Sequence, residues 1–184
     1  MQALVDAIYW LALATWFGTV LLSVIAPPIV LRVIREADPT LPRVLSVNLD
    51  AQHSVLLASN VIIEVLGTLF RLQAACAMAL LPALVAKWLI SDIAGLRVMV
   101  PIMVTALYIG AAGFHYYAWR IVLPKVAAHR AKFIEHADDP DIANAELDQF
   151  DRYSSEASSV VRNLLFVLLG MILFSSAMLP RLSV

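Results

Sequence analysis

Residues 7–31 read AIYWLALATWFGTVLLSVIAPPIVL and contain no charged side chain before Arg32. A bilayer core about 30 Å thick is crossed by roughly 20 apolar residues in a helix. This stretch is long enough to span a membrane with some tilt, so we predict a first transmembrane helix at about 7–33. We do not expect a cleaved signal peptide here, because no basic residue precedes the run and the run exceeds the length of a signal core.

The composition supports a membrane protein and argues against several other classes. Of the 184 residues, 61% are hydrophobic and 15% are charged, whereas ordinary soluble domains carry about 25% charged residues. The net charge of −1 and the lack of a basic, aromatic surface predict no nucleic-acid partner. The single cysteine, Cys76, excludes an intramolecular disulfide and a cysteine metal cluster.

Three further apolar segments, at about 72–90, 98–122 and 161–180, predict three more spans. Residues 43–71 place apolar residues on one helix face and polar residues on the other. This pattern predicts a separate amphipathic helix at the membrane interface or against a partner subunit. Residues 120–160 carry a basic arm and then an acidic arm, with Pro140 suited to open a helix. We therefore expect an antiparallel helical hairpin that extends spans three and four.

Together these segments predict one all-α domain over residues 1–184, a multi-pass integral membrane four-helix bundle. The two loops on one side of the predicted spans hold ten Lys and Arg residues, and the other side holds three. Because positive residues stay cytoplasmic, we expect the hairpin in the cytoplasm and both termini outside it. The expected location is the bacterial inner (plasma) membrane.

The first span contains a polar seam that we consider a candidate ligand path. Thr15, Thr19 and Ser23 recur every four residues on one helix face, and Pro27 follows on the same helix. Pro27 and Pro28 lack an N–H, which frees the carbonyls one turn earlier. The alternatives are a proline kink satisfied by adjacent helices, or a seam that admits an ion or a small solute.

Small residues at spacings of four mark candidate helix-packing faces, because they let helix backbones approach closely in a membrane. These positions are Ala14 and Gly18 in the first span, Ala75, Ala79 and Ala83 in the second, and Ala106 and Gly110 in the third. Such faces are typical of a homo-oligomer or of contacts with other membrane-protein subunits, in addition to membrane lipids.

His115 is the one histidine inside a predicted span, and Tyr108 lies two turns earlier on the same face. An ionisable residue within a membrane span is a candidate functional residue. A haem ligand is one reading, although no second histidine lies at a matching depth; a hydrogen-bonding residue is the other. The chain has no nucleophile–base motif, phosphate loop or zinc signature, so we expect no catalytic residue, no metal and no cofactor.

Several short motifs resemble the transmembrane-protein-205-like membrane proteins, a domain family of unknown function. They are Trp16-Phe17-Gly18 followed by Ala26-Pro27-Pro28, Gly67-Thr68-Leu69-Phe70-Arg71, and the stretch from Phe150 through Asn163. The order of four spans is similar along nearly the whole chain. The family pattern often has a histidine four residues after the phenylalanine, where this chain has Ser154. The resemblance implies a small multi-pass protein with no established activity, in a family loosely linked with tolerance of toxic compounds.

The leading functional hypothesis is a non-enzymatic membrane protein that acts as a structural or assembly subunit of a membrane complex. One alternative is a small-solute or ion carrier or pore that uses the polar seam of the first helix. The other alternative is a haem-binding redox subunit. Small-residue faces favour assembly, a continuous polar path favours transport, and a second histidine opposite His115 favours haem.

Overall fold

The computed structural model describes residues 2–37, 53–90, 99–136 and 139–176, and nearly all of them are helical. The helices are α1 (Gln2–Ala37), α2 (His53–Ile90), α3 (Met99–Tyr117), the π-helix η3 (Ala118–Val122), α4 (Leu123–Glu135) and α5 (Pro140–Ser176). Because α3, η3 and α4 run on without a break, the described residues form four long helices, and all four are long and apolar enough to cross a membrane. The predicted all-α class is confirmed.

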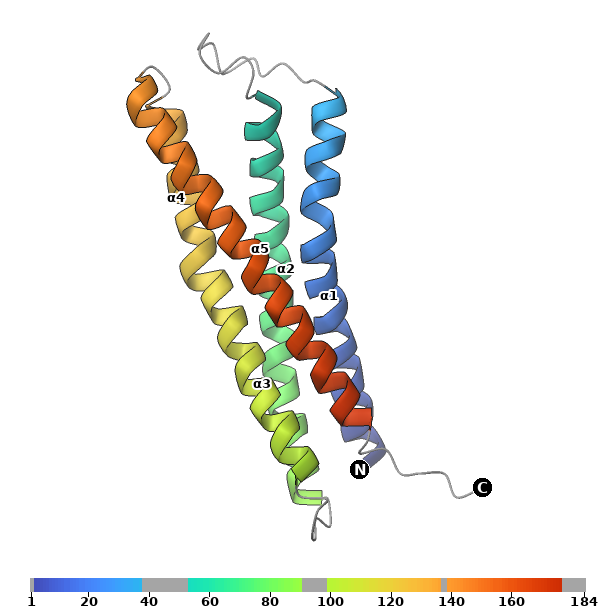
Figure 1. The fold of residues 1–184 in the computed structure, drawn as a ribbon. Coiled ribbons are helices and arrows are strands. Elements are labelled where there is room, and N and C mark those ends of the chain that lie inside the picture. The colour runs from blue at the N-terminus through green and yellow to red at the C-terminus, as the bar shows by residue number, and fades with distance from the viewer. Residues whose placement is uncertain (1, 38–52, 91–98, 137–138, 177–184) are drawn as a thin grey trace.

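The four long helices run side by side in alternating directions (Figure 1). They contain 36 to 38 residues each. At a rise of 1.5 Å per residue each helix is about 55 Å long, nearly twice the thickness of a bilayer core. Each helix therefore extends well beyond any membrane that it crosses.

Charge divides the bundle along its length. Residues 7–23, 72–86, 99–117 and 163–176 contain no Asp, Glu, Lys or Arg; we call this part the apolar half. Asp6 and Lys87 form an ion pair at 2.7 Å at one edge of it. At the other edge stand the exposed residues Arg71, Arg120 and Arg162. On the side of these three arginines, the charged half consists of residues 24–37 of α1, 53–71 of α2 and 140–162 of α5, with η3 and α4, although residues 24–31 of α1 are themselves apolar.

The hydrophobic core lies mainly in the apolar half, where all four long helices contribute. Tyr9, Leu13, Trp16 and Val20 of α1 are fully buried, at the helical spacing of four, three and four. The facing side chains include Leu80 of α2, Val104 of α3 and, from α5, Leu164, Leu168 and Met171. Because lipid is as apolar as these side chains, van der Waals packing and interhelical hydrogen bonds stabilise such a core within a bilayer.

The predicted division of the second segment is wrong. Residues 53–90 form one continuous helix, where we expected an interfacial helix over 43–71 and a separate span over 72–90; residues 43–52 lie outside the described residues. Gly67 costs a helix about 1 kcal/mol relative to alanine, which is too little to break a helix that packs along α1. The amphipathic pattern itself holds, since Phe70 is buried in the core and Glu64 is exposed.

The predicted helical hairpin is confirmed as a fold element. Helix α4 packs antiparallel to the first part of α5 (Figure 1), with a small core of its own around Phe133 and Ala143. Helix α5 begins at Pro140, as expected for a residue that lacks an N–H. Residues 137 and 138 of the predicted turn, and residues 177–180 of the fourth predicted span, lie outside the described residues.

Candidate functional site

Three polar side chains from three helices form a buried network at the end of the apolar half where Arg71, Arg120 and Arg162 stand. Ser23 of α1, Gln73 of α2 and His115 of α3 are each at most 5% exposed. The Gln73 amide nitrogen Nε2 donates to Ser23 Oγ at 3.1 Å. The Gln73 Oε1 atom lies 3.2 Å from His115 Nδ1. One glutamine therefore ties α1 to α3.

The directions of these hydrogen bonds determine the tautomer of His115. The carbonyl oxygen of Thr19 accepts a hydrogen bond from Ser23 Oγ at 2.9 Å, so the Ser23 oxygen offers its lone pairs to the amide of Gln73. The amide nitrogen of Gln73 then faces Ser23 and its carbonyl oxygen faces His115. Since an amide oxygen only accepts, His115 Nδ1 carries the proton. In the neutral imidazole, His115 Nε2 is then the ring atom with a free lone pair.

Aromatic rings surround His115. The ring centroids of Phe70, Trp16 and Trp119 lie 5.7, 6.2 and 5.8 Å from that of His115. Trp16 also packs edge-on against Tyr108 at 6.2 Å. Within the described residues, Trp16 Nε1 and His115 Nε2 are the two fully buried side-chain nitrogen or oxygen atoms without a hydrogen-bond partner.

The structure brings only part of the predicted seam into this network. The Thr19 hydroxyl donates to the carbonyl oxygens of Thr15 and Trp16, both at 2.9 Å. Thr15, Thr19 and Pro27 are half-buried, and Ser23 alone reaches Gln73. Hydroxyl groups that bond to the preceding turn of their own helix are common for Ser and Thr. The hydrogen bonds of Thr19 and Ser23 therefore run along α1 and, through Gln73, across to α2.

Tyr108 lies near His115 but has a different partner. Its hydroxyl donates to the carbonyl oxygen of Ala77 in α2 at 2.9 Å. Tyr108 and His115 both contact Trp16, so the two residues that we singled out in the third span belong to one aromatic cluster with a tryptophan from α1.

Sequence reasoning missed Gln73, the residue that connects the network. A signal was present, because Gln73 is the one amide among residues 72–86, a stretch otherwise made of apolar residues and one cysteine. Uncharged polar side chains within membrane helices often hydrogen-bond across helices. Such a residue in an apolar span is therefore as informative as the histidine.

The small-residue positions separate into packed and uncovered ones. Ala83 is buried, Ala79 packs against the core, and a Cβ built on Gly110 would lie 4.0 Å from Val167 of α5. A glycine that we did not single out, Gly170, lies against Leu107 in the same α3–α5 contact. The positions on the outside of the bundle are Ala14, Gly18, Ala75 and Ala106. A Cβ built on Gly18 would meet no atom within 4 Å, so the Ala14–Gly18 face packs on no other helix of the described chain.

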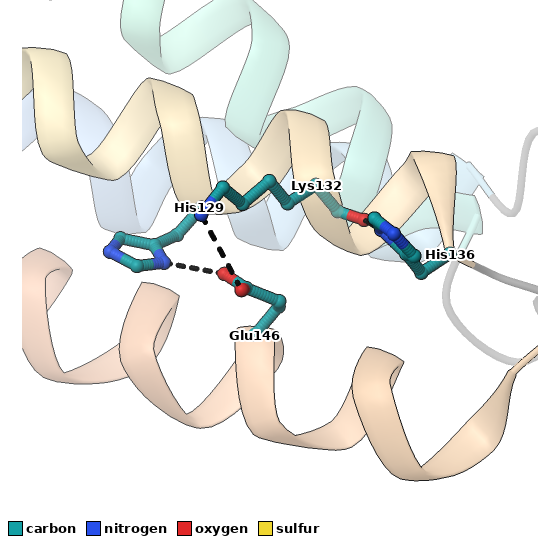
Figure 2. Close-up of polar contacts among 4 residues, drawn as sticks. All are labelled: His129, Lys132, His136 and Glu146. Atoms are coloured by element: carbon teal, nitrogen blue, oxygen red, sulfur yellow. Dashed lines mark hydrogen bonds and ion pairs between the residues drawn. The ribbon is translucent and has the colours of Figure 1, made fainter.

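The hairpin holds a second polar cluster, which Figure 2 shows. Glu146 of α5 lies between His129, at 2.5 Å, and Lys132, at 3.8 Å, both of α4. The hydrogen bond from His129, with the charge of Lys132, holds the pKa of the Glu146 carboxyl below its ordinary value. His136 Nδ1 donates to the carbonyl oxygen of Lys132 at 3.0 Å. The acidic arm thus meets the basic arm at Glu146.

The remaining members of the predicted arms have other surroundings. Lys125 lies over the ring of Tyr153, which stacks on His129 at 5.2 Å. Arg130 Nε donates to Ser59 Oγ of α2 at 2.8 Å. Across the part of the chain that the structure describes, no group of three or more His, Cys, Asp or Glu side chains is arranged to hold a metal ion.

Comparisons of this chain with protein families, with curated proteins and with solved structures find no match.

Proposed function

We propose that this multi-pass protein is a non-enzymatic assembly subunit of a membrane complex, and that it associates through the outer face of α1. The observation that carries the proposal is the uncovered Ala14–Gly18 face. Small residues let two helices approach closely enough for extensive van der Waals contact, which drives association within a bilayer. A second copy of the chain is the first occupant to test.

Helix α1 is the least covered of the four candidate spans. Of the residues in its most apolar stretch 11% are buried, against 22% to 39% in the other three. Its buried side chains face α2, α5 and, at Trp16, α3, while Leu11, Ala14 and Gly18 point away from the bundle. An apolar helix at the edge of a bundle, with a small-residue pair outward, suits contact with a further helix.

The polar seam supports this proposal over the carrier. A solute path needs polar atoms that are free to exchange bonds with the solute, whereas the hydroxyls of Thr19 and Ser23 donate to backbone carbonyls of α1. Gln73 uses its amide nitrogen on Ser23 and its amide oxygen on His115. The two hydrogen bonds of Gln73 tie helices together, which is the role expected of polar residues in a packed membrane bundle. We also propose that the chain is related to the transmembrane-protein-205-like proteins, which it resembles in several short motifs. This resemblance implies no established activity.

The substitution Gly18→Leu tests the proposal, because nothing within the chain obstructs it. An added side chain at Gly18 meets open space, so the variant should keep the stability of the monomer. In an interface built on close approach, overpacking costs about 1–3 kcal/mol, which weakens self-association by about 5- to 150-fold. We would measure the dissociation constant in lipid vesicles by energy transfer between labelled copies.

Gly113→Leu is the matched control. Gly113 is also exposed, a Cβ there also meets no atom within 4 Å, and it lies on α3 instead of α1. We expect Gly18→Leu to weaken association while Gly113→Leu leaves the dissociation constant at its wild-type value. Association that Gly18→Leu leaves intact, or a wild-type protein that is monomeric at every lipid dilution, would refute self-assembly through this face.

A further inference from the structure

Two unpartnered polar atoms lie in the same buried cluster. Trp16 is fully buried and His115 is 5% exposed, and their atoms Nε1 and Nε2 lack a hydrogen-bond partner within the described residues. Most buried polar atoms in native proteins are paired with protein or with an ordered molecule. Two exceptions on rings that contact each other point to a bound group that hydrogen-bonds to both nitrogens.

The chemistry of the two atoms is complementary. An indole N–H can only donate a hydrogen bond, and His115 Nε2 can only accept one while Nδ1 holds its proton toward Gln73. A hydroxyl group both accepts and donates. One oxygen with a hydrogen bond of about 2.9 Å on each side joins two atoms up to about 6 Å apart. The Trp16 and His115 rings contact each other edge to face, and one oxygen bridges Nε1 and Nε2 where both atoms face the same side of that contact.

The surroundings suit a neutral, partly apolar guest. Phe70 and Trp119 pack against His115, and no Asp, Glu, Lys or Arg lies in the apolar half. Trp119 belongs to the π-helix η3, and the exposed Arg120 lies over its ring at 4.7 Å. Single π-helical turns occur frequently at functional sites. Trp119 therefore lies between His115 and Arg120, one of the three arginines at the edge of the apolar half.

We propose that the Trp16–His115 cluster binds one hydroxyl group, which accepts a hydrogen bond from Trp16 Nε1 and donates one to His115 Nε2. The hydroxyl belongs either to a water molecule or to a small phenol dissolved in the membrane. The site lies inside the bundle and does not depend on association through the outer face of α1.

Nuclear magnetic resonance of the full chain in lipid nanodiscs, with ¹⁵N-labelled tryptophan, tests the site. Phenol is titrated in, and toluene serves as the matched probe that lacks the hydroxyl. Trp88 is an internal control, because its Nε1 already donates to Thr105 Oγ1 at 3.0 Å. Trp16→Phe identifies the resonance of Trp16.

Binding of a membrane phenol predicts that the Trp16 indole signal shifts saturably with phenol, whereas toluene has no such effect and Trp88 does not respond. His115→Phe should then weaken phenol binding about five- to tenfold, the value of one hydrogen bond. If water occupies the site, phenol should cause no shift. Magnetisation should instead transfer from a bound water to the Trp16 N–H, and Trp88 should show no such transfer. A Trp16 signal with neither response in the wild-type protein overturns the proposal, whether or not the His115 variant folds.

Discussion

The substitution Gln73→Leu probes the buried network with little change in volume. Gln73 is fully buried and makes two hydrogen bonds between helices, at 3.1 and 3.2 Å. Hydrogen bonds between membrane helices are worth about 0.6 kcal/mol each on average, and up to about 1.7 kcal/mol. We therefore expect Gln73→Leu to lower the free energy of unfolding by about 1–3 kcal/mol.

A double-mutant cycle isolates the bond to His115. The variants Gln73→Leu, His115→Phe and their combination are unfolded with increasing sodium dodecyl sulfate in mixed micelles, followed by circular dichroism. We expect a coupling energy of about 0.6 kcal/mol or more. Ser175 bonds to Tyr9 and shares no partner with Gln73, so Gln73→Leu combined with Ser175→Ala should be additive. Additivity in the His115 cycle as well, or a Gln73→Leu variant as stable as the wild type, would refute the reasoning.

Two further predictions concern the hairpin. A reporter inserted at Asp139 should be active in the cytoplasm and one fused after Val184 should be active outside it, because ten of the thirteen Lys and Arg residues lie on the hairpin side of the predicted spans; the opposite pattern would invert the orientation. The pKa of Glu146 is lowered in the folded state. Its stabilising contact with His129 is therefore fully present above the ordinary glutamate pKa of about 4.3, and it is lost as the pH falls through the pKa of the folded state. Limited proteolysis of the hairpin should therefore accelerate at acid pH in the wild type, and Glu146→Gln, cleaved faster at neutral pH, should lose much of this acid effect; equal pH profiles would contradict the pairing.

The sequence predicts the four long helices well because their signal is local. An apolar run such as residues 7–31 has one stable form in a bilayer, a helix that satisfies its own backbone. The break that we placed before residue 72 was wrong because a change from amphipathic to apolar pattern changes the surroundings of a helix without interrupting it. The hairpin followed from Pro140 and from the two charged arms, whereas its specific pair at Glu146 depends on the register between α4 and α5.

The candidate site was predictable only in part. His115 and Ser23 stand out as polar residues in apolar helices, but their connection runs through Gln73, which pairs with residues 50 and 42 positions away. Long-range partners of this kind depend on how helices rotate and pack, which the period of a single helix does not specify. The same limit applies to Gly18: the spacing to Ala14 indicates a packing face, and the structure is needed to see that the face is turned outward.

The division of the bundle into an apolar half within the membrane and a charged half outside it is tested most directly by cysteine labelling. With Cys76 replaced by alanine, single cysteines are placed at exposed positions of the four long helices in the apolar half, Leu11, Met78, Ile109 and Phe166, and at the exposed Ala128 in the hairpin. A charged maleimide should label Ala128→Cys in open membrane fragments and leave the other four unlabelled until detergent dissolves the bilayer. Labelling of any of those four in intact bilayers at the rate of Ala128→Cys would contradict the account.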